Sequence, residues 1–410
     1  MNFDEKIKEY ARLTVRTCGN VTPGKTVVLV CPVVAAQFGR LIVQEAYDAG
    51  ARDVIVIYSD EKMSRIRYMN ADLSVISSIP AWQAEQRNMY AREGCVSIMI
   101  LAEDPDAFTG VDDAKLMASA IARRNAFKDY YDATDRGEVR WTLVADPCIE
   151  WARKMFPGES DEVAFDHLWY SIFAACRLTD NNTAQKWHEN DAVLKSRAKK
   201  LNELKLTALK YKNSLGTDFT VGLAPGHIWE GGSEKCREGV DFFANMPTEE
   251  IFTIPHRERA EGRVFSSMPL IHQGTLIDKF YLTFKDGRVV DFDARVGKNA
   301  LERILKTDEG SLRLGEVALV PFNSPISEMN TLFYNTLFDE NASCHLALGE
   351  CYPDTLEGGI YMTEEELIAH GGNRSVNHVD FMIGTRDLSI TGILADGSEV
   401  AVFTQGNFAF

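Results

Sequence analysis

Acidic and histidine side chains gather in four short stretches of the second half of the sequence. The stretches are ANMPTEEIFTIP (244–255), LGEVALVPFNSPIS (314–327), LFDENASCHLALGECYPD (337–354) and NHVDFMIG (377–384). Together they offer a set of three glutamates, an aspartate and two histidines. Carboxylates with imidazoles suit Zn²⁺, Co²⁺ or Mn²⁺, and the absence of cysteine from the set argues against a purely structural zinc site. Because the set exceeds what one ion needs, it favours a two-metal centre that shares a carboxylate and activates a water.

Each stretch also has an explanation that needs no metal. Glu316 stands at the head of an apolar strand, where burial is costly unless the carboxylate is paired or metal-bound, but it could be an exposed strand end. His378 and Asp380 share one face of a strand, where they could form a simple hydrogen bond. Two glutamates after Thr248 would equally suit a capped helix start. Only the four stretches taken together favour a metal.

A parallel sheet is predicted in the first half of the chain. Continuous apolar runs at 25–33, 51–60, 95–104 and 139–147 are typical of buried strands, and helical patterns fall between them at 38–50, 62–92 and 113–130. Such alternation indicates an α/β domain. The first strand–helix turn, CPVVAAQFG, contains neither GxGxxG nor GxxxxGK[ST], so it does not support a dinucleotide or P-loop site. We therefore expect residues 1–190 to form an α/β scaffold domain.

The second half has the sequence pattern of antiparallel sheet. Asp286-Gly287 joins two extended runs over 280–294 as a type I′ turn would, and Asp396-Gly397 repeats the pattern over 389–406. A third hairpin is expected over 207–223, a polar connecting helix over 184–206, and shorter helices over 297–307 and 363–370. Residues 191–410 are thus predicted to be a metal-binding catalytic domain of the α+β class, rich in antiparallel sheet.

Composition indicates which classes of partner and which cellular compartment to expect. The 410 residues carry 44 basic and 60 acidic side chains, a net charge of -16, which disfavours nucleic acid. No apolar run approaches the ~20 residues that span a bilayer, and the start MNFDEKIKEYARL lacks the pattern of a signal peptide. The eight cysteines form no CxxC pair, and several lie in apolar segments, as reduced thiols of a cytoplasmic protein do.

In order and spacing, several segments resemble the M29 family of metallo-aminopeptidases. These are MPTEEIFT, EGRVFSS, LGEVALVPFNSPIS, FDENASCHLALG and NHVDFMIG, together with GTDFTVGL (216–223) and HIWEGG (227–232). The resemblance extends over essentially the whole chain and is densest in its second half. It implies removal of amino-terminal residues from peptides with a free N-terminus, by a two-metal centre enclosed in a homodimer.

Carried onto the matching positions, the resemblance implies a set of metal ligands. These would be Glu250, Glu316, Glu340, His345, His378 and Asp380, with Glu316 bridging two ions of Zn²⁺, Co²⁺ or Mn²⁺, or of Mg²⁺ as a further candidate. Tyr352 matches a tyrosine near the family's site and could donate a hydrogen bond to the oxyanion of the tetrahedral intermediate. Glu249 could carry the proton to the leaving amine, although a solvated surface acid is the alternative.

Other activities stay open at this point. Another two-metal hydrolase, an amidase or a phosphoesterase, would use the same ligand types. A non-enzymatic α/β ligand-binding protein is the alternative from a different class. A cysteine hydrolase is disfavoured because Cys344 and His345 are neighbours and would point to opposite faces of a strand, and a serine hydrolase lacks its GxSxG motif.

Overall fold

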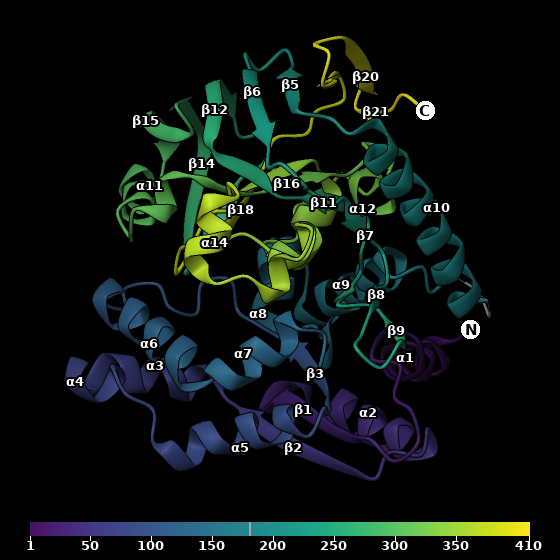
Figure 1. The fold of residues 1–410 in the computed structure, drawn as a ribbon. Coiled ribbons are helices and arrows are strands. Elements are labelled where there is room, and N and C mark those ends of the chain that lie inside the picture. Colours follow the sequence, from purple (N-terminus) through teal and green to yellow (C-terminus); the bar gives the residue numbers. More distant parts are fainter. Residues whose placement is uncertain (180–181) are drawn as a thin grey trace. The chain divides into compact units, whose positions relative to one another are not determined.

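The computed structural model describes residues 1–179 and 182–410, and these fall into two compact units. The first comprises Met1–Glu189 and Ser233–Thr248, and the second comprises Asn190–Gly232 and Glu249–Phe410. The predicted fold class is confirmed, because one unit holds a parallel sheet with helices and the other holds antiparallel sheets (Figure 1). The segment 233–248 lies in the first unit, whereas a division at 190/191 would assign it to the second.

Five parallel strands form the sheet of the first unit, in the order β10-β4-β3-β1-β2. The β10 strand comes from the late segment 233–248, and no pattern in the sequence announces a strand of two residues. The strands are β1 (Thr26–Pro32), β2 (Asp53–Ser59), β3 (Val96–Leu101), β4 (Arg140–Ala145) and β10 (Asn245–Met246); β8 (Glu234–Lys235) and β9 (Asp241–Phe242) make a separate pair. The α-helices are α1 (Phe3–Arg12), α2 (Ala36–Asp48), α3 (Glu61–Asn70), α4 (Leu73–Ile76), α5 (Ala81–Arg92), α6 (Asp113–Ala126), α7 (Lys128–Asp135), α8 (Ile149–Met155) and α9 (Asp161–Ala175).

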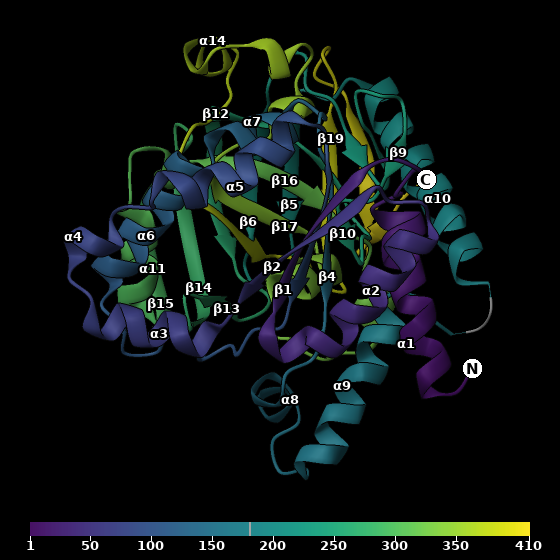
Figure 2. The same cartoon turned by 90° about the horizontal axis from the view of Figure 1, so that it is seen from below.

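Helices cover both faces of this sheet, and its strands are accordingly mostly apolar. On one face, Tyr10 of α1 stacks on Phe38 of α2 at 5.1 Å and meets Trp169 of α9 edge-on. On the other, Tyr130 of α7 and Ala91 of α5 share a core with Val28 of β1. Figure 2 shows α5 and α7 on one side of the strands and α1, α2 and α9 on the other. Three helices, α3 to α5, fill the region 62–92, and Pro80, which cannot lie inside a helix, stands at the N-cap position of α5.

Two antiparallel sheets and a peripheral set of helices form the second unit. The smaller sheet has the order β18-β17-β16-β11-β7, and the larger runs β13-β14-β12-β6-β5-β19-β20-β21 with β15 on β14. The strands are β5 (Ala208–Lys212), β6 (Asp218–Leu223), β7 (Glu230–Gly231), β11 (Ile251–Thr253), β12 (Pro255–Phe265), β13 (Leu270–His272), β14 (Thr275–Lys285), β15 (Arg288–Val296), β16 (Leu314–Leu319), β17 (His345–Gly349), β18 (His378–Met382), β19 (Ser389–Ile393), β20 (Glu399–Thr404) and β21 (Asn407–Phe408). The α-helices are α11 (Lys298–Leu305), α12 (Pro325–Glu328), α13 (Thr336–Asp339) and α14 (Glu364–Ala369), and α10 (Thr183–Leu204) enters this unit at residue 190.

Two of the predicted hairpins differ in the conformation of their turns. Asp286 and Gly287 both have positive φ, 50° and 74°, so the predicted type I′ turn between β14 and β15 is confirmed. The hairpin predicted over 389–406 also forms, from β19 and β20, but its type I′ turn was wrong: only Gly397 takes positive φ, 84°, and a longer loop closes through the hydrogen bond from Leu394 N–H to Ser398 O. A helix start after Thr248 was also wrong, since strand β11 follows the two glutamates.

One hydrophobic core joins the two sheets of the second unit. Phe219, Phe280 and Phe284 of the larger sheet meet Leu346 and Phe381 of the smaller one in it. Burying a large apolar side chain contributes roughly 1.5–3 kcal/mol, so this shared core can offset the cost of polar groups placed on the other face of the smaller sheet. Within residues 1–179 and 182–410, the structure contains no helix of the length and apolarity needed to cross a membrane.

Candidate metal centre

Strand alternation sends four of the predicted ligands to one face of the smaller sheet. Along β16, β17 and β18 every second residue packs into the hydrophobic core: Val317, Leu319, Leu346, Leu348, Val379 and Phe381. The residues between them carry Glu316, His345, His378 and Asp380, which therefore point away from the core. The same alternation turns Cys344 to the core side, where its thiol donates a hydrogen bond to Val320 O, so a Cys344–His345 catalytic pair is not formed.

Small residues on the ligand face leave room between the polar groups. Ala347 lies directly opposite Glu316 on one neighbouring strand and Asp380 on the other. Ala318 lies opposite His345 in the same way. A larger side chain at position 347 or 318 would occupy the space into which the carboxylates and the imidazole project.

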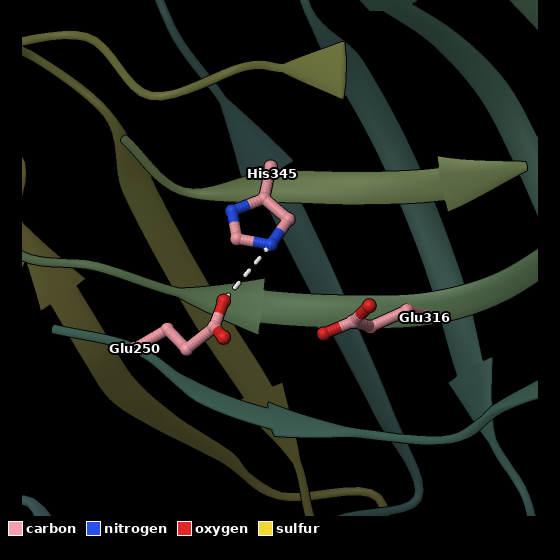
Figure 3. Close-up of side chains that lie close together, drawn as sticks. All are labelled: Glu250, Glu316 and His345. Atoms are coloured by element: carbon pink, nitrogen blue, oxygen red, sulfur yellow. Dashed lines mark ion pairs between the residues drawn. The ribbon is translucent and has the colours of Figure 1, made fainter. Parts of the chain in front are cut away.

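The first cluster joins Glu250, Glu316 and His345, whose ligand atoms all lie within 4.8 Å of one another (Figure 3). His345 Nε2 is 3.1 Å from Glu250 Oε2. The other ring nitrogen, Nδ1, is 3.0 Å from Ser343 O, which fixes the ring and assigns the proton to Nδ1. Glu250 reaches the cluster because it immediately precedes β11, the strand that pairs with β16.

The second cluster joins Glu316, His378 and Asp380. His378 Nε2 lies 3.1 Å from Glu316 Oε2 and 3.3 Å from Asp380 Oδ1. Its Nδ1 is 2.8 Å from Glu350 O, which repeats the orientation of His345. Glu316 belongs to both clusters, so one carboxylate connects them.

Burial dominates the acid–base behaviour of Glu316 and Glu340. It raises the pKa of Glu316, and the hydrogen bond with His378 only partly opposes it. It also raises the pKa of Glu340 well above the usual range, an effect to which the charges of Glu250 and Asp380 add. These electrostatic effects show that Glu340 lies beside the clusters, although it belongs to neither.

The imidazoles behave in the opposite way. Burial by itself would lower the pKa of His345, but the hydrogen bond with Glu250 and the charges of the surrounding carboxylates together outweigh it, and the pKa is raised well above its usual value. Asp380 and Glu316 raise the pKa of His378 in the same way, again against burial. Burial would also raise the pKa of Asp380, but His378 brings it below its usual value. Protons on Nε2 therefore balance the carboxylates in the absence of another cation.

These residues fit divalent cations. Two imidazoles turn Nε2 toward carboxylates while a backbone carbonyl holds Nδ1, the arrangement typical of metal-ligating histidines. Asp380 Oδ1 is buried and, apart from its ion-pair contact with His378 Nε2, has no hydrogen-bond partner among the described residues. A cation would displace the Nε2 protons and satisfy that oxygen.

The remaining predicted site residues lie at different distances from the clusters. Tyr352 places its hydroxyl 3.3 Å from His378 Nε2, and its ring contacts Phe252 and the His378 ring. Glu249 is only 4% exposed, so the alternative of a solvated surface acid was wrong. Its carboxylate joins neither cluster, and its charge acts on the half-buried Arg197.

Sequence reasoning missed the groups that orient the predicted ligands. The carbonyls of Ser343 and Glu350 orient the histidines, and Arg374 Nη1 fixes the Glu350 carboxylate at 2.8 Å. Asn341 accepts a hydrogen bond from Glu249 N–H at 2.7 Å across 92 positions of sequence. No local pattern marks these residues, because backbone carbonyls and amide side chains act here through tertiary contacts.

Comparison with known proteins gives one consistent result. The family model described as thermophilic metalloprotease (M29) matches residues 3–408. Aminopeptidase AmpS of Bacillus subtilis is 42% identical over 409 residues, covering 100% of both chains, and aminopeptidase T of Thermus aquaticus is 36% identical, covering 99% of both. The solved structure of AmpT from Thermus thermophilus superposes with a TM-score of 0.92 at 37% identity, over 100% of both chains.

Proposed function

Because the chain belongs to the M29 family of metalloproteases and is a metallo-aminopeptidase, we propose that it cleaves amino-terminal residues from peptides at a two-metal centre. The observation that carries the two-metal proposal is the position of Glu316, shared by a cluster with Glu250 and His345 and a cluster with His378 and Asp380. Two cations bridged by one carboxylate would place a ligand set on each side of it.

The proposed ligands are the residues of the two clusters together with Glu340. Glu250, Glu316 and His345 would hold one cation, and Glu316, His378 and Asp380 the other. Divalent cations bound there would supply Lewis acidity toward the scissile carbonyl and lower the pKa of a water toward ~7. Zn²⁺, Co²⁺ and Mn²⁺ suit this mixture of oxygen and nitrogen ligands best.

Protein groups around the clusters would handle the substrate. The carboxylates give the site a negative field that favours the free α-ammonium group of a peptide. The Tyr352 hydroxyl, beside His378, would donate a hydrogen bond to the oxyanion of the tetrahedral intermediate. Glu249, next to Glu250 in the chain, is our candidate for carrying the proton to the leaving amine. Glu249→Gln should then lower kcat while metal binding is kept, and unchanged kcat would remove it from the mechanism.

A direct assay separates this activity from its alternatives. The purified chain should hydrolyse an amino-acid p-nitroanilide after addition of Co²⁺, Zn²⁺ or Mn²⁺ and should lose that activity with a chelator. A phosphate monoester should not be cleaved. The N-acetylated form of the same p-nitroanilide is the matched control, and equal cleavage of both forms would refute the exopeptidase proposal.

Variants of the shared and unshared ligands test the metal assignment. Glu316→Ala and His345→Ala should abolish turnover while the circular dichroism spectrum of the folded chain is kept. Metal content measured by mass spectrometry should fall with them. Activity within tenfold of the parent chain would contradict these assignments.

We further propose a cytoplasmic homodimer. All eight cysteines are free and buried, which suits a reducing compartment. Light scattering after size-exclusion chromatography should give twice the mass of the 45.9 kDa chain, and a monomer mass would exclude the dimer.

A further inference from the structure

Asn341 is a fully buried side chain whose amide joins three segments of the second unit. Its Oδ1 accepts a hydrogen bond from Glu249 N–H at 2.7 Å. Its Nδ2 donates to Leu337 O at 2.8 Å and, at a longer 3.4 Å, to Glu340 Oε1. The three segments are the one that leads into β11, the helix α13, and the 3₁₀ turn Glu340–Ala342.

The Asn341 contact with Glu340 matters because Glu340 lies outside the sheet. Four of the other proposed ligands lie on strands whose ladder hydrogen bonds fix their backbone, but Glu340 lies on a short 3₁₀ turn outside the sheet. Glu250 also lies just outside a strand, one residue before β11. Both of these carboxylates therefore depend on contacts other than the ladder for their position.

We propose that Asn341 is a positioning residue that sets Glu250 and Glu340 at the spacing the metal centre requires. The inference rests on the metal site proposed above. The amide holds the backbone beside Glu250 through its oxygen and the Glu340 carboxylate through its nitrogen, so one side chain couples the two segments.

An amide side chain can both accept a hydrogen bond from Glu249 N–H and donate one to the Glu340 carboxylate. Aspartate in its place would keep an acceptor for Glu249 N–H but would lose the donor and place a like charge beside Glu340. An apolar residue would leave the buried Glu249 N–H without its acceptor, which typically costs about 1–3 kcal/mol. Groups that support metal ligands in this way commonly change metal affinity by about 10–100-fold when they are removed.

The test compares Asn341→Ala with a matched variant, Asn88→Ala. Asn88 is also nearly buried and makes the same type of bridge, from Nδ2 to Ala126 O at 2.8 Å and from Tyr130 N–H to Oδ1 at 3.3 Å, but it lies in the first unit. Both variants lose one buried amide. Co²⁺ binding by the full-length apo chain is measured by calorimetry, and the visible absorption of bound Co²⁺ reports the ligand geometry.

We expect Asn341→Ala to bind Co²⁺ about 10–100-fold more weakly than the parent, with a changed visible spectrum, and Asn88→Ala to match the parent in both. Equal affinities and spectra for the two folded variants would overturn the proposal. If Asn341→Ala does not fold, Asn341→Asp, which has the same shape, replaces it, and an unchanged Co²⁺ spectrum would then overturn the proposal. A parent chain that binds no Co²⁺ would overturn the metal site itself, whereas an active, Co²⁺-binding parent with indistinguishable variants would overturn only the role of Asn341.

Discussion

Asp146, at the end of β4, gives a prediction whose magnitude follows from burial. The residue is 6% exposed, and its N–H donates to Leu101 O at 2.8 Å. Burial raises the pKa of its carboxyl group from 3.8 to about 8. In the folded chain the group is therefore mostly protonated at neutral pH, whereas in the unfolded chain it is ionised.

The sign of the effect on stability follows from proton binding. Between about pH 4 and pH 8 the folded state binds a proton that the unfolded state has released, so the free energy of unfolding falls as pH rises. At about 1.4 kcal/mol per pKa unit, the loss relative to acid pH is about 2 kcal/mol at pH 5 and about 4 kcal/mol at pH 7. Replacing the carboxyl with an amide of the same shape removes this pH-dependent loss.

Asp146→Asn should thus be more stable than the parent by up to about 4 kcal/mol at pH 7, and its advantage should grow from pH 5 to pH 8. Equilibrium urea unfolding at pH 5, 6, 7 and 8, with a chelator present, measures the difference. Asp166 on α9 is exposed, and Asp166→Asn, the control, should change the free energy of unfolding by less than about 0.5 kcal/mol. An Asp146→Asn advantage that is absent at pH 7, or that does not grow with pH, would refute the reasoning.

Three further outcomes are expected. Tyr352→Phe should lower kcat roughly 100-fold, because one oxyanion donor is lost, with KM and metal content unchanged; kcat within twofold of the parent would exclude that role. Ala347→Leu should fill the space between Glu316 and Asp380 and weaken Co²⁺ binding at least tenfold in a chain that still folds, and calorimetry showing parent-like affinity would contradict this use of the small residue. Zn²⁺ or Co²⁺ at 100 times its dissociation constant should stabilise the parent by about 2.7 kcal/mol but not Glu316→Ala, and equal shifts in Tm for both would show that the cation binds elsewhere.

The sequence predicts which strand-borne residues of the candidate site share one face, because side chains two residues apart on a strand point the same way. His378 and Asp380 are two residues apart, so a strand sends both to one face, and they lie 3.3 Å apart at Nε2 and Oδ1. Glu316 interrupts an apolar run, and that interruption is the signal of a carboxylate turned away from the core. The parallel sheet of the first unit can also be predicted from the sequence, because strands buried on both faces are continuously apolar.

What the sequence does not predict depends on contacts between distant segments. Residues 245–246 join the parallel sheet although they follow β4 by about a hundred positions, and a two-residue strand has no periodicity to detect. Glu249 looks like a surface acid or a helix start in sequence, but it is buried, and its N–H donates to the distant Asn341 side chain. The turn type at Asp396-Gly397 could not be predicted either, since the same dipeptide occurs in loops of different length.

Charge balance explains why this cluster favours cations over a permanent network of ion pairs. Four carboxylates, those of Glu250, Glu316, Glu340 and Asp380, surround two imidazoles, so protonating both histidines still leaves an excess of acids. The raised pKa values of Glu316 and Glu340 show how the protein balances that excess without metal, by holding additional protons on buried carboxyl groups. A stable ion-pair network would match acids to bases and satisfy every buried oxygen, yet Asp380 Oδ1, apart from its ion-pair contact with His378, accepts no hydrogen bond from the described residues. Divalent cations would replace those protons with stronger ligand bonds, so metal binding should release protons, and the number released should fall in Glu340→Gln.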